Sequence, residues 1–226
     1  MMKKLLSILV TCALSMPALA LEPELSRSSE RYSYAMGVRL GQLLKSQGIQ
    51  QLDSGAFANA IDDVLLDRPL RLSAEQMVAA IQEQQKLFAQ QKQQRAQVNL
   101  ETGHAFLAAN AEKPGITVLP GGVQYRVLES GTGAQPTPVS SVRVHYHGTL
   151  LDGTVFDSSV ERKLPAEFSL AAVIPGFRDS ISAMRVGDRW QVFIPSDRAY
   201  GEDGAGSDIG PNETLVFEIQ LLDVMQ

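Results

Sequence analysis

The residues best placed to do chemistry lie in one stretch, SVRVHYHGTLLDGTVFDSS, which runs from Ser141 to Ser159. It alternates as a strand does, turns at the favoured type I′ pair Asp152-Gly153, and returns through Phe156 to Asp157. Asp157 could be a catalytic carboxylate, the polar edge of an apolar pocket, or only a turn or capping residue. Phe156 could line a binding pocket or belong to the core.

Two histidines in the same stretch raise the question of a metal site. By the two-residue period of a strand, His145 and His147 share one face, while Tyr146 points to the interior from the other. Such a pair could begin a metal site, but the only other histidine, His104, lies far upstream in a helical segment. Two solvated histidines are the favoured interpretation, so we expect no bound metal and no other cofactor.

The first twenty residues have the features of a secretory signal peptide. A basic start precedes an apolar run over residues 5–14, too short to span a bilayer, and the sequence Ala-Leu-Ala ends at Ala20. We expect cleavage after Ala20 and export to the periplasm, where association with the outer membrane stays open. Cys12, the only cysteine, leaves with this peptide, so the mature chain forms no disulfide. Acylation at Cys12 is an alternative that fits less well, because Thr11 is a poor residue before a lipidated cysteine.

The mature chain is acidic. Removal of Lys3 and Lys4 with the signal peptide leaves 18 of the 20 Lys and Arg residues against 25 Asp and Glu, a net charge of -7 with His neutral. Nucleic acids and anionic membrane surfaces select for clustered basic residues, so we expect no nucleic-acid partner. No later apolar run approaches the roughly 18 residues that indicate a membrane-spanning helix.

Composition divides the mature chain in two. As far as about Asn110 it is rich in Gln, Ala, Leu, Lys, Arg and Glu, which favour helices. From Pro114 onward Gly, Pro, Val, Thr and aromatic residues dominate, which is typical of strands and turns. We therefore predict an α+β protein with a signal peptide over residues 1–20, an all-helical domain over 21–70, a long connecting helix over 71–112 and a β-rich domain over 113–226.

The all-helical part is too small to enclose a core of its own. Apolar residues at intervals of three and four predict a helix over about residues 28–47, ended by Gly48, and a shorter one from about Ser54. We expect these helices to pair with a second copy of the chain, as a dimerisation domain. The alternative is that they pack on the β-rich domain of the same chain.

A third helix is predicted to be unusually long. It begins with a capping box of Ser73 and Gln76 and continues without a breaker to near Asn110. At 1.5 Å per residue it would be about 57 Å long. Its middle, AQQKQQRAQ from Ala89 to Gln97, holds no large apolar residue, so we interpret it as a solvated bridge that holds the two parts apart.

The C-terminal part resembles a known family. VHYHGTLLDGTVFDSS, VIPGF, MRVGDRW, AYG and GPNETLVFEIQLLDV occur in the order and spacing of the FKBP-type peptidyl-prolyl isomerase domain, over about residues 122–224. The preceding helices are similar to the N-terminal dimerisation region of the Mip-like (macrophage infectivity potentiator) subgroup. The resemblance implies an antiparallel half-barrel sheet wrapped round a short helix, and catalysis of cis/trans rotation about X-Pro bonds.

The resemblance also assigns roles to residues at matching positions. Tyr200 would donate its hydroxyl to a carbonyl of the peptide, Ile174 would offer its backbone N–H, and Arg162 would contact Asp157 and keep it ionised. Ordinary core packing is the alternative role for each aromatic residue. The implied catalytic residues are Tyr146, Phe156, Asp157 and Tyr200, and the implied substrate-binding residues are Arg162, Val173, Ile174, Phe177, Ile209 and Phe217.

Such a site makes chemical sense without a nucleophile. The twisted amide of an X-Pro bond is less polar than the planar one, so a dry aromatic pocket favours it. In agreement, the sequence contains no Gly-x-Ser-x-Gly motif, phosphate-binding loop or clustered metal ligands.

The resemblance implies partners as well. These are unfolded or partly folded exported proteins with X-Pro bonds, a second copy of the chain, and macrolide inhibitors such as tacrolimus and rapamycin. Phe177 stands where the family usually has a Trp, which puts macrolide affinity in doubt more than catalysis. Two alternatives stay open, a periplasmic chaperone or binding module with weak or no isomerase activity, and a surface-displayed adhesion or virulence factor.

Overall fold

A computed structural model describes residues 25–49 and 51–225 of the chain. The predicted signal peptide, with Cys12, lies outside the described residues. The chain separates into two compact units, residues 1–47 and 48–226. Among the described residues, no helix is both long and apolar enough to cross a membrane.

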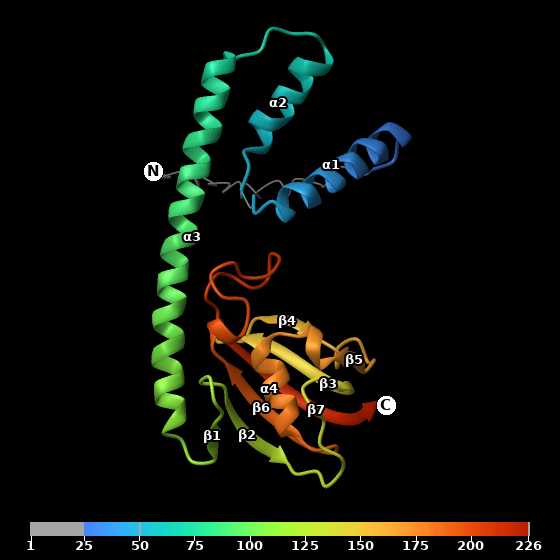
Figure 1. The fold of residues 1–226 in the computed structure, drawn as a ribbon. Helices are drawn as coiled ribbons and strands as arrows, with labels where there is room; N and C mark the ends of the chain where they lie inside the picture. Colours follow the sequence, from blue (N-terminus) through green and yellow to red (C-terminus); the bar gives the residue numbers. More distant parts are fainter. Residues whose placement is uncertain (1–24, 50, 226) are drawn as a thin grey trace, which may run out of the picture. The chain divides into compact units, whose positions relative to one another are not determined.

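The described part of the first unit is dominated by helix α1, Ser28–Ser46 (Figure 1). The backbone N–H of Arg27 donates to the Glu30 carboxylate at 2.9 Å at its start, which satisfies an end of the helix that would otherwise lack a partner. No residue of α1 is buried, and the side chains of Tyr32 and Leu43 are 68% and 52% exposed. The apolar side of α1 is therefore uncovered in the described chain.

Helix α2, Ser54–Leu65, follows in the second unit. Asp53 caps it by accepting a hydrogen bond from the Ala56 N–H at 2.7 Å. The buried Asp63 accepts a hydrogen bond from Arg71 at 2.9 Å, which ties α2 to the loop that follows it. The apolar side chains of α2 stay open to solvent, with Leu65 at 74% exposure.

Helix α3, Ala74–Ala111, is the long helix that the sequence predicts. The predicted capping box is confirmed: the Ser73 N–H donates to the Gln76 side chain at 2.9 Å, and the Gln76 N–H donates to Ser73 Oγ at 3.2 Å. None of its residues from 74 to 94 is buried. The first half of α3 is thus solvated, as its polar sequence indicates.

The C-terminal third of α3 packs against the β-rich domain instead of bridging to it. A Cβ at Gly103 would stand 2.3 Å from Thr214 Oγ1, so the close approach of helix and sheet requires glycine here. The buried Gln124 side chain donates to the Leu107 carbonyl at 2.8 Å and accepts from Asn110 at 2.9 Å. Only the earlier turns of α3 are therefore solvated, and its role in holding two parts of the chain apart stays a prediction.

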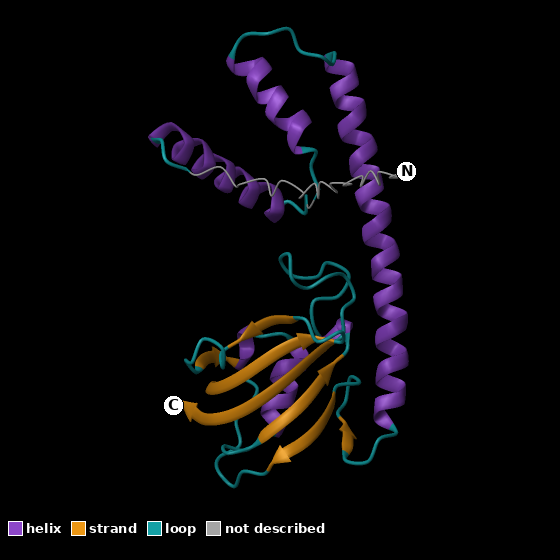
Figure 2. Ribbon diagram, turned by 180° about the vertical axis from the view of Figure 1, so that it is seen from behind, coloured by secondary structure: helices purple, strands orange, loops and turns teal. Residues whose placement is uncertain are grey.

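An antiparallel sheet of seven strands forms most of the rest of the second unit, in the order β1-β2-β6-β7-β3-β4 with β5 paired to β3. The strands are labelled in Figure 1, and the sheet is orange in Figure 2. Helix α4 lies over one face of this sheet in both figures. The predicted α+β fold, with an antiparallel sheet round a short helix, is confirmed. The bounds are β1 Ile116–Val118, β2 Gln124–Glu129, β3 Ser141–Leu150, β4 Val155–Ser158, β5 Ala166–Ser169, 3-10 helix η1 Leu170–Ala172, α4 Pro175–Ala183, β6 Arg189–Ile194, 3-10 helix η2 Ser196–Arg198 and β7 Leu215–Met225.

The core lies between α4 and the face of the sheet that it covers. Strand β3 alternates as predicted, so Val142 and Val144 are fully buried and Tyr146 is 6% exposed. Ile181 of α4 and Ile219 of β7 are buried in the same cluster. Burial of these apolar side chains is the main stabilising contribution to the domain.

The turn between β3 and β4 differs from the prediction. The Gly153 N–H donates to the Leu150 carbonyl at 3.1 Å, so the turn is centred one residue earlier than the Asp152-Gly153 pair. A type I′ turn needs positive φ at both central residues, but Gly153 has φ of 87° and Asp152 is not in that region. The Asp152 carboxylate instead accepts the Thr154 N–H at 2.9 Å, and this local bond favours the observed turn. The type I′ prediction is wrong.

Candidate active site

Five aromatic rings from five different elements meet on the covered side of the sheet. Tyr146 comes from β3, Phe156 from β4, Phe168 from β5, Phe177 from α4 and Phe217 from β7. The Phe177 ring is central, with centroids 6.1 Å from Tyr146, 5.9 Å from Phe168 and 5.2 Å from Phe217, and Phe156 meets Phe217 at 5.4 Å. These edge-to-face pairs are the favoured geometry for aromatic side chains. We call these five residues the aromatic cluster.

The start of α4 fixes the central ring. Pro175 occupies its first turn, where the missing N–H costs nothing. A Cβ at Gly176 would stand 2.3 Å from the Ile194 side chain, so glycine lets the helix approach β6 closely. Phe177 is therefore held at the bottom of the aromatic cluster with only 4% exposure.

A glycine on β3 makes room for the outer rings. A Cβ at Gly148 would stand 2.6 Å from the Phe156 ring and 2.9 Å from the Phe217 ring. Side chains of real residues do not approach this closely, so any larger residue would displace one ring. Gly148 thus determines how far the Phe156 ring reaches over the strand.

A charged group borders the aromatic cluster. The Tyr146 hydroxyl donates to one oxygen of Asp157, and Arg162 donates to the other. A second Arg162 nitrogen donates to the Tyr146 hydroxyl oxygen at 2.9 Å, and its guanidinium lies over the Tyr146 ring at 5.7 Å. The predicted contact between Arg162 and Asp157 is present, and Tyr146 links it to the cluster. We call these three groups the polar edge.

The polar edge has fixed charges near neutral pH. Burial alone would raise the pKa of Asp157, but hydrogen bonds from Tyr146 and Arg162 outweigh it and hold that pKa below its ordinary value. Burial and the bond to Asp157 raise the pKa of Tyr146 above its usual range. Asp157 is therefore ionised and Tyr146 neutral, which suits a site that orients dipoles rather than one that transfers protons.

Two protein-family models match the chain. The model of the FKBP-type peptidyl-prolyl cis-trans isomerase matches residues 133–222, and the model of the domain amino terminal to this isomerase matches residues 29–127. The outer membrane protein MIP of Legionella longbeachae is 42% identical over 204 residues, which cover 88% of this chain and 87% of that protein. The chain belongs to the FKBP-type peptidyl-prolyl cis-trans isomerases.

Other relatives support the same family for this isomerase. The FKBP-type 22 kDa peptidyl-prolyl cis-trans isomerase of Escherichia coli K12 is 40% identical over 85% of this chain and 94% of that one. Among solved structures, FkpA from Escherichia coli has a TM-score of 0.62 at 29% identity, covering 88% of this chain and 97% of that one. The predicted family, its Mip-like character and its isomerase function are confirmed, and nothing favours the alternative of a binding module without catalysis.

Most residues that the family resemblance assigns to the site lie together. Tyr146, Phe156, Phe177 and Phe217 belong to the aromatic cluster, and Asp157 with Arg162 lies at its polar edge.

The remaining assigned residues border the same core. Val173 and Ile174 are half-buried and pack on it, and Ile209 is 8% exposed within it. Tyr200 is different: its side chain is 41% exposed, and in the described part of the chain its ring pairs with none of the aromatic cluster.

Sequence reasoning missed Phe168 and Gly148. On β5 the half-buried residues Ala166 and Phe168 alternate with the exposed Glu167 and Ser169, and this strand alternation could have marked Phe168 as facing inward. Nothing in the sequence marks Gly148, because only the folded structure brings two rings against it. The histidines meet hydroxyl groups, His145 at 3.1 Å from Ser159 Oγ and His147 at 2.9 Å from Ser158 Oγ.

Isomerase activity should be almost flat between about pH 5 and pH 8, because neither Asp157 nor Tyr146 changes charge there. As pH falls through the lowered pKa of Asp157, the carboxylate becomes protonated and loses its pairing with Arg162, so activity should fall only in acid. The measurement is kcat/KM for an uncharged Ala-Pro peptide across this range. Asp157→Asn is the control and should lack the acid limb. A sharp titration near neutral pH would show that proton transfer takes part.

Proposed function

We propose that the aromatic cluster and its polar edge form the site that binds proline and catalyses rotation of X-Pro bonds. The observation that carries this proposal is the network of Tyr146, Asp157 and Arg162 at the border of five packed rings. It combines an apolar surface for a proline ring with one fixed carboxylate. Such a combination, with few polar groups, is typical of small-ligand sites.

Rotation about the peptide bond needs no covalent intermediate. Its barrier is about 18 to 20 kcal/mol because the C–N bond has partial double-bond character. The twisted amide has lost this resonance and is less polar at the carbonyl, so transfer from water to an apolar surface favours it over the planar form. The aromatic cluster supplies that surface, and the enzyme lowers the barrier by differential binding.

Polar groups at the border orient the peptide. The ionised Asp157 disfavours the partial negative charge of a planar carbonyl oxygen beside it. The Tyr200 hydroxyl and the Ile174 N–H are donors for peptide carbonyls, and no described residue accepts a hydrogen bond from that N–H. Two donors and a carboxylate are enough to select one orientation of a twisted X-Pro bond.

Exchange spectroscopy on a short Ala-Pro peptide tests this proposal. The full chain should accelerate cis/trans exchange, and Tyr200→Phe should lower kcat/KM about threefold to tenfold, the effect of one net hydrogen bond of about 1 kcal/mol. The far-ultraviolet spectrum should not change, because the Tyr200 side chain is exposed. Equal rates for Tyr200→Phe and the natural chain would remove Tyr200 from the proposed site.

We also propose that tacrolimus and rapamycin compete for this site. Phe177 is smaller than the tryptophan usual in the family and carries no indole N–H, so their affinity should be lower than is usual while catalysis persists. The competition is read from the same exchange measurement.

The helices support a proposed homodimer. No residue of α1 is buried, and on α2 the residues Phe57, Ile61 and Leu65 line an apolar depression of about 320 Å³. Exposed apolar faces of this kind are typical of surfaces that a partner covers. A second copy of the chain would bury both faces at once.

Export completes the proposal. The signal-like residues 1–20 lead to the periplasm, and one relative is named an outer membrane protein. Clients would be unfolded or partly folded exported proteins with X-Pro bonds. Fractionation of cells tests the location: the chain should be found, without residues 1–20, in the periplasmic or outer-membrane fraction.

A further inference from the structure

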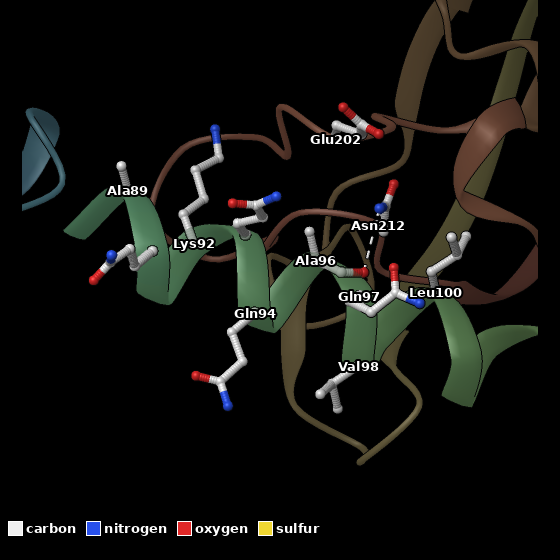
Figure 3. A pocket seen from close by; sticks show the side chains of 11 residues that line it. Ala89, Lys92, Gln94, Ala96, Gln97, Val98, Leu100, Glu202 and Asn212 are labelled. Carbon is white, nitrogen blue, oxygen red and sulfur yellow. Dashed lines mark hydrogen bonds between the residues drawn. The ribbon is translucent and has the colours of Figure 1, made fainter. Parts of the chain in front are cut away.

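Helix α3 is bonded to the segment that closes the Tyr200–Ile209 loop. The Asn99 side chain donates to the Pro211 carbonyl at 2.8 Å and to the Glu213 carboxylate at 2.9 Å. In return, the Asn212 side chain donates to the Ala96 carbonyl of α3 at 3.2 Å, the dashed line in Figure 3. Asn99 on the helix thus donates to the loop segment, and Asn212 on that segment donates to the helix backbone; we call these two residues the asparagine pair.

The same segment is bonded to the loop beside Tyr200. The Asn212 backbone N–H donates to the Gly201 carbonyl at 2.8 Å, directly after Tyr200 in the chain. At the other end of the loop, Ile209 and Ala205 exchange backbone hydrogen bonds at 3.1 and 2.9 Å. The bonds of Asn212 therefore connect α3 to Gly201, the residue after Tyr200. The bond to Pro211 connects α3 to a residue two positions after Ile209.

The backbone at Asn212 restricts which residue can do this. Its φ is 54°, in the left-handed region where Asn is several times more common than most other side chains. The residue is 7% exposed, so its amide must find a partner in the protein. Asn is suited to both requirements, whereas Gly would meet only the first.

Arg95 of α3 also contacts this part of the chain, since its side chain lies beside Gly210. Between the helix and the loop lies a cleft of about 860 Å³, lined by the polar middle of α3 together with Glu202 and Asn212 (Figure 3). The exposed Arg95 forms an ion pair with Glu213 at 3.5 Å, a contact of small energy at a solvated site. The asparagine pair is thus the main polar connection between the helix and the loop.

We propose that the asparagine pair positions Tyr200 and Ile209 and thereby sets the preference of the enzyme for the residue before proline. This rests on the proposed placement of Tyr200 and Ile209 at the proline site. Asn99 and Asn212 touch no substrate and act through the loop. A shift of the loop moves one donor and one apolar wall, so it changes substrates of different size unequally.

The test uses the full chain with Asn99→Ala and Asn212→Gly. The second keeps the positive φ and removes only the side-chain amide. We expect the ratio of kcat/KM for Leu-Pro and Ala-Pro peptides to change about threefold or more in each variant, on the scale of one net hydrogen bond. Asn212→Asp keeps the shape but loses the donor, so it should behave like Asn212→Gly.

Two controls separate positioning from general destabilisation. Gln97→Ala removes an exposed amide that bonds only within α3, to Glu101, and should leave the ratio unchanged. Asn110→Ala breaks a buried contact between α3 and β2, and should lower the melting temperature while leaving the ratio unchanged.

A readout that does not depend on activity completes the design. The amide resonances of Gly201 and Ile209 should shift in Asn99→Ala, where the loop sequence is untouched. Folded Asn99→Ala with the natural ratio and unshifted resonances would overturn the inference, even if Asn212→Gly does not fold. The absence of any effect of Tyr200→Phe would instead count against the proposed placement of Tyr200 at the proline site.

Discussion

Replacing Phe156 by Ala is expected to lower kcat/KM for a short X-Pro peptide about tenfold or more, a loss of about 1.4 kcal/mol of transition-state stabilisation. The Phe156 ring packs edge-on against Phe217 at 5.4 Å and covers Gly148, so its removal opens the outer wall of the aromatic cluster. Water would then reach the peptide carbonyl and restore the advantage of the planar amide. The measurement is peptide exchange at equal concentrations of folded protein.

The preceding residue provides the matched control for this prediction. Val155 is 41% exposed on the same short strand and adds no aromatic ring to the cluster. Val155→Ala should therefore leave kcat/KM within about twofold of the natural value. Because Phe156 is only half-buried, both variants should keep the far-ultraviolet spectrum of the natural chain. Equal activity of the two variants would exclude Phe156 from the site.

The site was predictable from the sequence where local rules decide the position of a side chain. The strand period predicts that Tyr146 points to the interior, and the family motif assigns Phe156 and Asp157 to the site. Arg162 follows Asp157 by five residues, close enough for the observed bond. The bond from Tyr146 to Asp157 was not predicted, because it depends on the antiparallel register that sets Gly148 opposite Asp157. Register between strands is a tertiary property that no local pattern fully specifies.

The fold, too, was predictable where local rules apply and unpredictable where tertiary contacts decide. Ser73 and Gln76 cap α3 as predicted, because a capping box depends on residues three apart. The docking of α3 was missed in part because two residues at this contact look like surface residues. Asn110 and Gln124 are polar amides, yet they are 2% and 4% exposed and satisfy one another. Polar groups can be buried when each has a partner, and sequence alone does not show the partner.

Removal of α1 and α2 is expected to leave the activity on short peptides nearly unchanged and to lower the activity in protein refolding. The docking of α3 on the β-rich domain determines where the chain should be cut. A fragment that starts at residue 112 loses Leu107, the Phe106 ring that packs on Phe193 at 5.6 Å, and both partners of Gln124. Loss of one buried Leu side chain alone costs about 2–5 kcal/mol, so this fragment should be markedly destabilised. A fragment of residues 92–226 keeps these contacts and the asparagine pair, and should melt near the temperature of the natural domain.

Fragment 92–226 lacks the exposed apolar faces of α1 and α2, so it should be a monomer in sedimentation, whereas the full chain should be a dimer. On a tetrapeptide its activity per site should be nearly full, because such a peptide occupies one proline site. On a protein whose refolding is limited by a cis proline it should be several-fold slower per site, because two linked sites rebind a long client more readily than one. Fragment 112–226 lacks α3 and is the control for the contribution of this helix to both activities. It is measured at a temperature where it is folded. A dimeric fragment 92–226 would exclude α1 and α2 as the dimer interface. A monomeric fragment as active in refolding as the full chain would show that linkage of two sites contributes nothing.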